Sequence, residues 1–125
     1  MTIIEDQQAQ YLIKSLQHHP SPYLILTKEA GVEWMNKSAQ YVFDTTEISD
    51  IDIAPIVSHG ASKKIEAIGS SFQSDLELSL RKIKFFLRSR IHEIPLDKED
   101  SFFLIEVLAQ SEAALSALKN TIACL

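Results

Sequence analysis

Apolar and polar positions change their spacing several times along this chain of 125 residues. Near the start, apolar residues recur at the three- and four-residue spacing of one helix face. They are Ala9, Leu12, Ile13 and Leu16. The pattern predicts an amphipathic helix from about Glu5 to His18, which Pro20 and Pro22 end. Its apolar face needs a cover, supplied either by the chain's own sheet or by the same helix of a second copy, with Leu12 and Leu16 in the interface.

The next segment predicts a strand, a tight turn, a second strand and a helix. Leu24 to Leu26 form an apolar run, and Lys28 to Gly31 have turn chemistry, with a glycine able to adopt a positive φ. Val32 and Trp34 then alternate with polar residues like a half-buried strand. Asn36 stands at a helix N-cap position, followed by an apolar helical stripe. That stripe consists of Ala39, Val42 and Phe43.

These residues resemble the opening of a PAS (sensory box) domain. Gly31, Asn36 and Ala39 match the glycine and the Asn-x-x-Ala spacing of that opening in register. Thr27 stands where the family often has Asp, and Asp44 stands where a Gly is common. The resemblance implies a five-stranded antiparallel sheet with helices on one face, and a sensory role in signalling.

The middle of the chain predicts helical turns rather than strands. Residues 45–59 are rich in Ile and Asp around Pro55, which favours short helical turns. Gly60 to Gly69 then has apolar residues at helical spacing, including Ile65, and Gly69 is a plausible helix C′ residue. The resemblance places the long helix that lines the ligand cleft of a PAS domain here.

The second half switches to the two-residue period of strands. Three segments alternate in this way, and a charged loop from Leu96 to Ser101 separates the last two. The alternating residues are Leu76, Leu78 and Leu80; Ile83, Phe85 and Leu87; and Phe103, Ile105 and Val107. The order of elements predicts an α+β fold. We expect an N-terminal flanking helix in residues 1–20, a PAS core in 21–110 and the start of a C-terminal signalling helix in 111–125.

The C-terminal tail has the apolar spacing of a coiled-coil seam. The seam residues are Leu115, Leu118, Ile122 and Leu125. Their spacing predicts a homodimer through this helix, although a lone helix packed on its own domain has the same pattern over so short a length. With no residue to stop it, we expect the helix to continue. The resemblance implies that it leads to an effector, commonly a diguanylate cyclase (GGDEF) or a histidine kinase of a two-component system.

Composition excludes several classes of protein. The net charge of −5 disfavours non-specific nucleic-acid binding. No apolar run is long enough for a membrane span, and the N-terminus lacks the basic start of a secretory signal, so we expect a cytoplasmic location. The single cysteine, Cys124, excludes an intrachain disulfide and lies outside the expected core. LOV-type flavin chemistry, which needs a cysteine within the fold, is therefore not expected.

The sequence contains few candidate catalytic, metal-binding or ligand-binding residues. No residues combine as a catalytic site, no metal-ligand spacing occurs, and we expect no enzyme activity from this segment. The resemblance suggests His59 as a haem ligand, but a structural role is the favoured interpretation because no other residue supports haem. We expect a cleft that is filled or small; an open one would bind a small molecule. Its candidate lining residues are Trp34, His59, Ile65, Phe72 and Phe85.

Three functions compete at this point. The favoured one is a cytoplasmic PAS sensor or dimerisation module that regulates an effector domain in the same chain. The second is a ligand-free structural dimerisation domain with a solid core. The third is a small cone-shaped α+β ligand-binding or isomerase-like protein, which would need an acid or base in a cavity.

Overall fold

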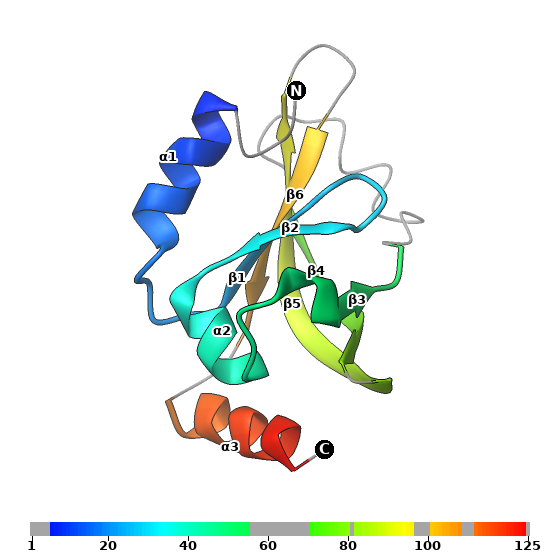
Figure 1. The fold of residues 1–125 in the computed structure, drawn as a ribbon. Coiled ribbons are helices and arrows are strands. Elements are labelled where there is room, and N and C mark those ends of the chain that lie inside the picture. Colours follow the sequence, from blue (N-terminus) through cyan, green and yellow to red (C-terminus); the bar gives the residue numbers. More distant parts are fainter. Residues whose placement is uncertain (1–5, 56–70, 81, 97–100, 109–111, 125) are drawn as a thin grey trace.

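The computed structural model describes residues 6–55, 71–80, 82–96, 101–108 and 112–124. Within these residues, one antiparallel sheet is flanked by helices on both faces (Figure 1). The predicted helix 60–69, with His59 and Ile65, lies outside the described residues. No helix in the described ranges has the length and hydropathy needed to cross a membrane.

The sheet has six strands in the order β2-β1-β6-β5-β4-β3, and every neighbouring pair is antiparallel. The strands are β1 (Tyr23–Leu26), β2 (Val32–Met35), β3 (Ile51–Ile53), β4 (Ser71–Leu80), β5 (Ile83–Pro95) and β6 (Ser101–Val107). The first and last strands in sequence, β1 and β6, are neighbours in the middle of the sheet. The α+β class and the meeting of the chain's two ends in the sheet are confirmed.

The predicted strand count of five is wrong by one. A 3₁₀ turn, η2 (Ile48–Asp50), is followed directly by β3, which pairs with the end of β4. Ile51 and Ile53 are buried, whereas Asp52 between them is exposed. This alternation is the pattern of a half-buried edge strand, so only part of the segment forms the expected helical turn.

The two faces of the sheet carry separate apolar clusters. The inner face, which α2 (Lys37–Phe43) covers, holds the larger cluster. The outer face is covered in part by α1 (Gln7–Leu16), whose Ala9 is fully buried. The residues of the outer cluster are Ala9, Ile25, Phe102 and Leu104, with Leu12, Ile13, Leu16, Tyr23, Trp34, Ile94 and Leu96 packed against them. In the single chain, therefore, α1 folds back on its own sheet.

A bulge in β2 decides which face its side chains reach. Ile25 pairs with Trp34, but the next residue, Leu26, pairs with Val32, so Glu33 is an extra residue on that strand. A bulge shifts the alternation by one position. Val32 consequently packs against the inner cluster and Trp34 against the outer one. The sequence expectation that the two share one face is wrong for this reason.

The C-terminal helix α3 (Glu112–Ala123) packs against α2, below it in Figure 1. Ile122 is fully buried and belongs to the inner cluster. The Lys119 ammonium lies 4.6 Å from the centre of the Tyr41 ring on α2, which is a cation–π contact. The seam residue Ile122 thus faces the chain's own core in this structure.

Candidate functional site

The β1–β2 turn is held by Thr27. Its amide donates to the Gly31 carbonyl at 2.8 Å, and its hydroxyl accepts from the Gly31 amide at 3.0 Å. A Cβ on Gly31 would lie 3.1 Å from that hydroxyl oxygen, so glycine allows the close approach. The left-handed residue of the turn is Ala30, at φ 68°, and not Gly31 as the sequence suggested.

Side-chain hydrogen bonds also hold the η2–β3 segment, on the opposite edge of the sheet from the β1–β2 turn. The Thr45 hydroxyl donates to Asp50 Oδ2 at 2.7 Å and accepts from the Glu47 amide at 3.1 Å. These bonds hold the segment so that it turns Ile48 and Ile51 toward the inner cluster. The opposite edges of the sheet, β2 and β3, therefore come into contact.

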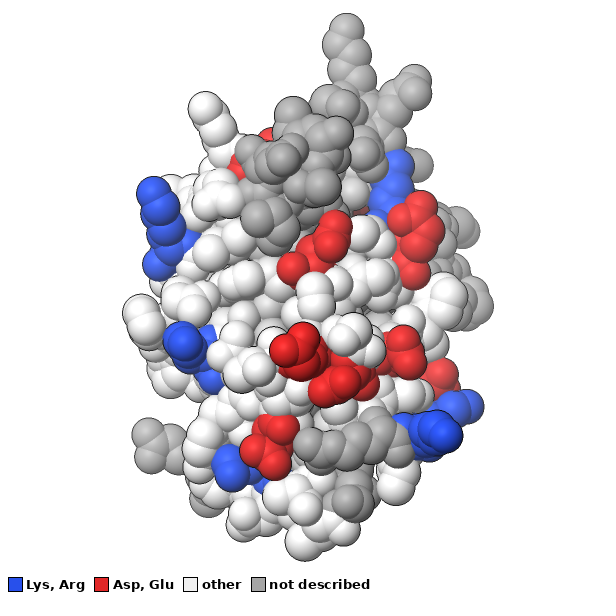
Figure 2. Space-filling model, viewed as in Figure 1, with Lys and Arg blue, Asp and Glu red and all other residues white. Residues whose placement is uncertain are grey.

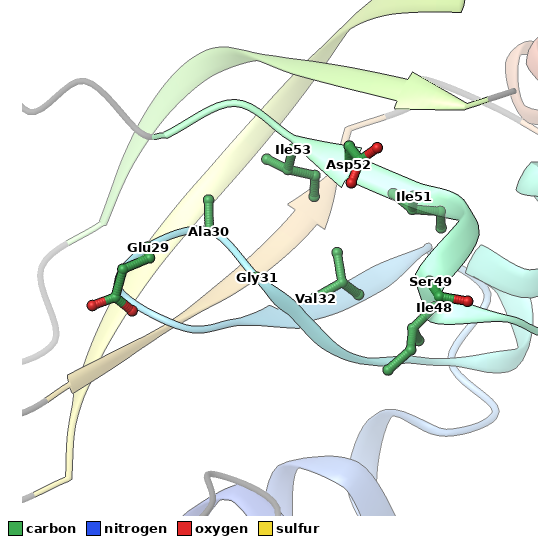
Figure 3. Close-up of a pocket in the computed structure, with 9 residues that line it drawn as sticks. All are labelled: Glu29, Ala30, Gly31, Val32, Ile48, Ser49, Ile51, Asp52 and Ile53. Atoms are coloured by element: carbon green, nitrogen blue, oxygen red, sulfur yellow. The ribbon is translucent and has the colours of Figure 1, made fainter. Parts of the chain in front are cut away.

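Where the two sheet edges meet, they border an open pocket of about 440 Å³, which we call the edge pocket (Figure 3). Val32 and the isoleucines of η2 and β3 form its apolar walls. The carboxylates of Glu29 and Asp52 lie at its rim and point outward in Figure 3. Its lining residues are Glu29, Ala30, Gly31, Val32, Ile48, Ser49, Ile51, Asp52 and Ile53. Apart from Gly31, none of them was among the candidate site residues.

The surface around the edge pocket is acidic. Asp50 of η2 and Asp52 of β3 are exposed, as is Glu47, the N-cap residue of η2. Acidic side chains gather over this part of the face shown in Figure 2, whereas Lys and Arg side chains lie toward its margins. Across this face, the electrostatic potential favours positively charged groups.

Asn36 is fully buried and joins three elements. Its Oδ1 accepts from the amides of Ala39 and Tyr23, both at 3.0 Å, which caps α2 and fixes the start of β1. Its Nδ2 donates to the carbonyls of Leu16 at 2.8 Å and Ser21 at 2.9 Å, which holds the end of α1 and the following loop. Asn36 is the N-cap predicted from the sequence, and it also links the helices on opposite faces of the sheet.

Two neighbouring residues strengthen this junction. The Lys37 amide donates to the Gln17 carbonyl at 3.0 Å. The Ser38 hydroxyl donates to the Pro20 carbonyl at 2.7 Å. The first turn of α2 is thus bonded to the chain that leaves α1, which limits independent movement of the two helices.

A charged row crosses the outer face beside α1. Tyr23, Glu106 and Arg90 lie in register on β1, β6 and β5. Arg90 Nη1 lies 3.3 Å from Glu106 Oε1. Partial burial raises the pKa of Tyr23, and the charge of Glu106 and the hydrogen bond to it act in the same direction. Burial lowers the pKa of His92, against the attraction of Glu106.

The lowered pKa of His92 predicts a loss of stability in mild acid. Because the pKa of His92 is lower in the folded chain, the unfolded chain binds this proton at a higher pH. The free energy of unfolding is therefore at its full value above the ordinary pKa of 6.5 and decreases as the pH falls below it. Urea unfolding at about pH 7 and about pH 5 measures the difference. We expect His92→Gln to reduce the pH dependence, and His18→Gln, at an exposed position, to leave it in place. An equal slope in wild type and His92→Gln would contradict the assignment.

The candidate cleft residues do not form one site. Phe72 and Phe85 are partly buried against the inner cluster. Trp34 lies on the outer face, against the side that α1 covers. Ala39, one of the residues that carry the PAS resemblance, is buried in the inner cluster, next to the N-cap Asn36. Leu115 and Leu118 lie on α3, and Leu12 and Leu16 face the chain's own sheet.

The histidine at the end of α1 has a local structural role. His19 Nδ1 accepts from the Ser21 amide at 3.0 Å, and its ring meets the Tyr23 ring edge-on. It therefore stabilises the turn after α1. Among the described residues, no three His, Cys, Asp or Glu side chains lie close enough to hold a metal ion.

The arrangement of strands and helices is found in solved structures. The PAS domain of nitrogen regulation protein NR(II) from Vibrio parahaemolyticus matches with a TM-score of 0.52 and 14% sequence identity, over 76% of this chain and 94% of that one. The chain has a PAS fold. In this PAS fold, β3 is an addition to the five strands that the sequence resemblance implied.

Two further PAS domains are similar. One is from a two-component sensor histidine kinase, with a TM-score of 0.47 and 12% identity over 81% of this chain and 95% of that one. The other is from Bordetella pertussis BvgS, with a TM-score of 0.44 and 14% identity over 95% of this chain and 100% of that one. No family model matches the sequence, and no curated protein matches it.

Proposed function

We propose that this PAS domain is a sensory transmission module of a signalling protein, in which α3 conveys the packing state of the core to an effector. The observation that supports this is the position of Ile122, which is fully buried in the inner cluster although it lies near the end of α3. Because α3 docks through a residue of the inner cluster, a change in the packing of that cluster would change how α3 docks.

The proposed mechanism is a shift between two packings. In one, α3 is docked on α2 through Ile122 and the Lys119–Tyr41 contact. In the other, α3 is released and can pair with a second copy through the seam of Leu115 and Leu118. An input acts only to the extent that it binds one packing more tightly than the other.

The input site that we propose is the edge pocket. Its volume of about 440 Å³ is within the usual range for small-molecule pockets. It contacts η2, which follows α2 closely in sequence, so a ligand there can change how α2 packs. The rim carboxylates favour a ligand that carries a positive charge beside an apolar part.

The output side of the proposal follows the sequence resemblance. The effector would be a diguanylate cyclase or a histidine kinase that follows α3 in the same cytoplasmic chain. A homodimer is part of the proposal because two-subunit effectors need their partners brought together.

The test is an effector fusion. A diguanylate cyclase domain is joined in continuous helix after Leu125, and its product is measured for wild type and Ile122→Asp. We expect the variant to change the output at least about fivefold, the lower range of typical allosteric coupling. The matched control is Ala123→Asp, which puts the same charge on an exposed neighbour. Equal output from wild type and Ile122→Asp would overturn the proposal.

A further inference from the structure

The edge pocket has an acidic group at each end and an apolar middle. Glu29 belongs to the β1–β2 turn, and Asp52 is the exposed middle residue of β3. Their carboxylates lie at different ends of the lining in Figure 3, with Ala30, Val32 and Ile53 between them. The pocket thus offers a hydrogen-bond acceptor at each end and an apolar surface between the two.

Both of these carboxylates are available to a ligand. In the described part of the chain, ion pairs join β5 to β4 and β5 to β6, and neither pair involves Glu29 or Asp52. Asp50, by contrast, already accepts the hydroxyl hydrogen of Thr45. Two negative charges without a positive partner among the described residues attract a ligand with positive charge at both ends.

The side chains that line the edge pocket limit the chemistry of that ligand. None of the described lining residues is aromatic, so the pocket has no ring that would hold a quaternary ammonium group. Apart from the two carboxylates, Ser49 is the only described lining residue whose side chain forms hydrogen bonds. A sugar or another neutral polar ligand would therefore leave most of its own polar groups unpaired.

Two other kinds of ligand fit the edge pocket poorly. An extended peptide that added a strand between β2 and β3 would need about 4.8 Å on each side, but these two strands are already in contact. A divalent metal ion needs several ligands around one point. No three His, Cys, Asp or Glu side chains of the described residues come together in that way.

From these features, we infer that the edge pocket binds a linear aliphatic diamine, with one ammonium at Glu29, the other at Asp52 and the methylene chain against Val32 and Ile53. Each ammonium donates hydrogen bonds to a carboxylate, and the methylene chain covers apolar surface. The inference rests on the proposed function, since it names the ligand of the proposed input site. A bound diamine would bridge the two opposite edges of the sheet and hold η2, beside α2, in place.

The experiment is a titration of the isotope-labelled protein with linear diamines of increasing length, from ethylenediamine to diaminooctane, followed by two-dimensional NMR. We expect the amide signals of Gly31, Val32, Asp52 and Ile53 to shift, and the Kd to be lowest at one chain length. Butylamine and the other monoamines should bind at least about threefold more weakly than diamines of equal length, because they form only one of the two ion pairs.

Three variants test the two ends of the edge pocket. Glu29→Gln and Asp52→Asn each remove one charge and keep the shape of the side chain. Because both carboxylates are exposed, we expect each variant to weaken the best diamine by about three- to fivefold, close to the affinity of a monoamine for the wild type. The matched control is Glu47→Gln, which removes the same charge from an exposed neighbour outside the lining and should leave the Kd unchanged.

Several results would overturn this inference. A Kd that does not depend on chain length, or a loss of affinity in Glu47→Gln equal to that in Asp52→Asn, would show only general attraction to the acidic surface. If a lysine tripeptide shifted these amide signals and no diamine did, the ligand would be a basic segment of another protein. Each of these results leaves the proposed function standing, because the effector fusion with Ile122→Asp uses no ligand. Conversely, unchanged output from that fusion would overturn the proposed function without altering the Kd of the diamine.

Discussion

Replacing Asn36 by alanine will lower the free energy of unfolding by about 3 to 5 kcal/mol. The substitution removes the partner of two amides and of two carbonyls, which come from α1, the loop after it, β1 and α2. Each buried polar group left without a partner costs about 1–3 kcal/mol, and the costs are only partly additive. Urea unfolding followed by the fluorescence of Trp34, the single tryptophan, measures the loss.

Aspartate at the same position separates the two roles of Asn36. Asp is as good an N-cap as Asn, so Asn36→Asp would be nearly neutral if capping α2 were the whole role. The carboxylate, however, faces the carbonyls of Leu16 and Ser21 without a hydrogen to donate. We expect a loss close to that of Asn36→Ala, and less of it in acid, where the carboxyl group is protonated. Ser38→Ala, which removes one exposed bond, is the control and should cost under about 1 kcal/mol.

Ile122→Asp will detach α3 from the domain. Burying a carboxylate in the inner cluster is unfavourable by more than the helix gains from docking, so α3 leaves and the charge stays in water. The loss is then limited to what the docking of α3 contributes, of which the burial of Ile122 accounts for about 2–3 kcal/mol. Hydrogen exchange measured by mass spectrometry should show faster exchange throughout residues 112–123, with β5 and β6 nearly unchanged.

The control for this experiment is again Ala123→Asp, because Ala123 is exposed and the same charge is placed at the same end of the helix. Its α3 should exchange as slowly as in the wild type. If Ile122→Asp left the protection of α3 intact, the buried position of Ile122 would not be what holds this helix. If β5 and β6 exchanged as fast as α3, the helix and the sheet would unfold as one unit.

The local sequence predicted the strands and the helix near Asn36, but not the hydrogen bonds that Asn36 makes to distant segments. The N-cap, the strands on either side and the helical stripe of α2 all follow from spacing within a few residues. The bonds from Asn36 to Leu16 and Ser21 join segments whose approach depends on the whole fold. An N-cap asparagine uses only its side-chain oxygen, so the amide hydrogens left to pair elsewhere are the signal that could have suggested these bonds.

Two errors show where spacing alone misleads. A one-residue bulge at Glu33 turns Trp34 to the outer face, and a single inserted residue leaves no mark in a four-residue strand. Conversely, Ile51 and Ile53 with Asp52 between them have the alternation of a strand, but the segment is too short to outweigh the helical interpretation. The edge pocket depends on both features, since β2 and β3 form its two sides. The residues that line the edge pocket could therefore not be predicted from the sequence.

The placement of β1 beside β6 has a consequence for how the chain folds. These two strands come from near opposite ends of the sequence, yet they pair in the middle of the sheet. During synthesis, the β4–β5 hairpin can form early because its strands are adjacent in sequence, whereas β1 must wait until β6 has left the ribosome. Until then its buried face of Leu24 and Leu26 has no partner strand on that side. Folding should consequently be slow for a domain of this size, and the nascent chain is exposed to aggregation until its last strand arrives.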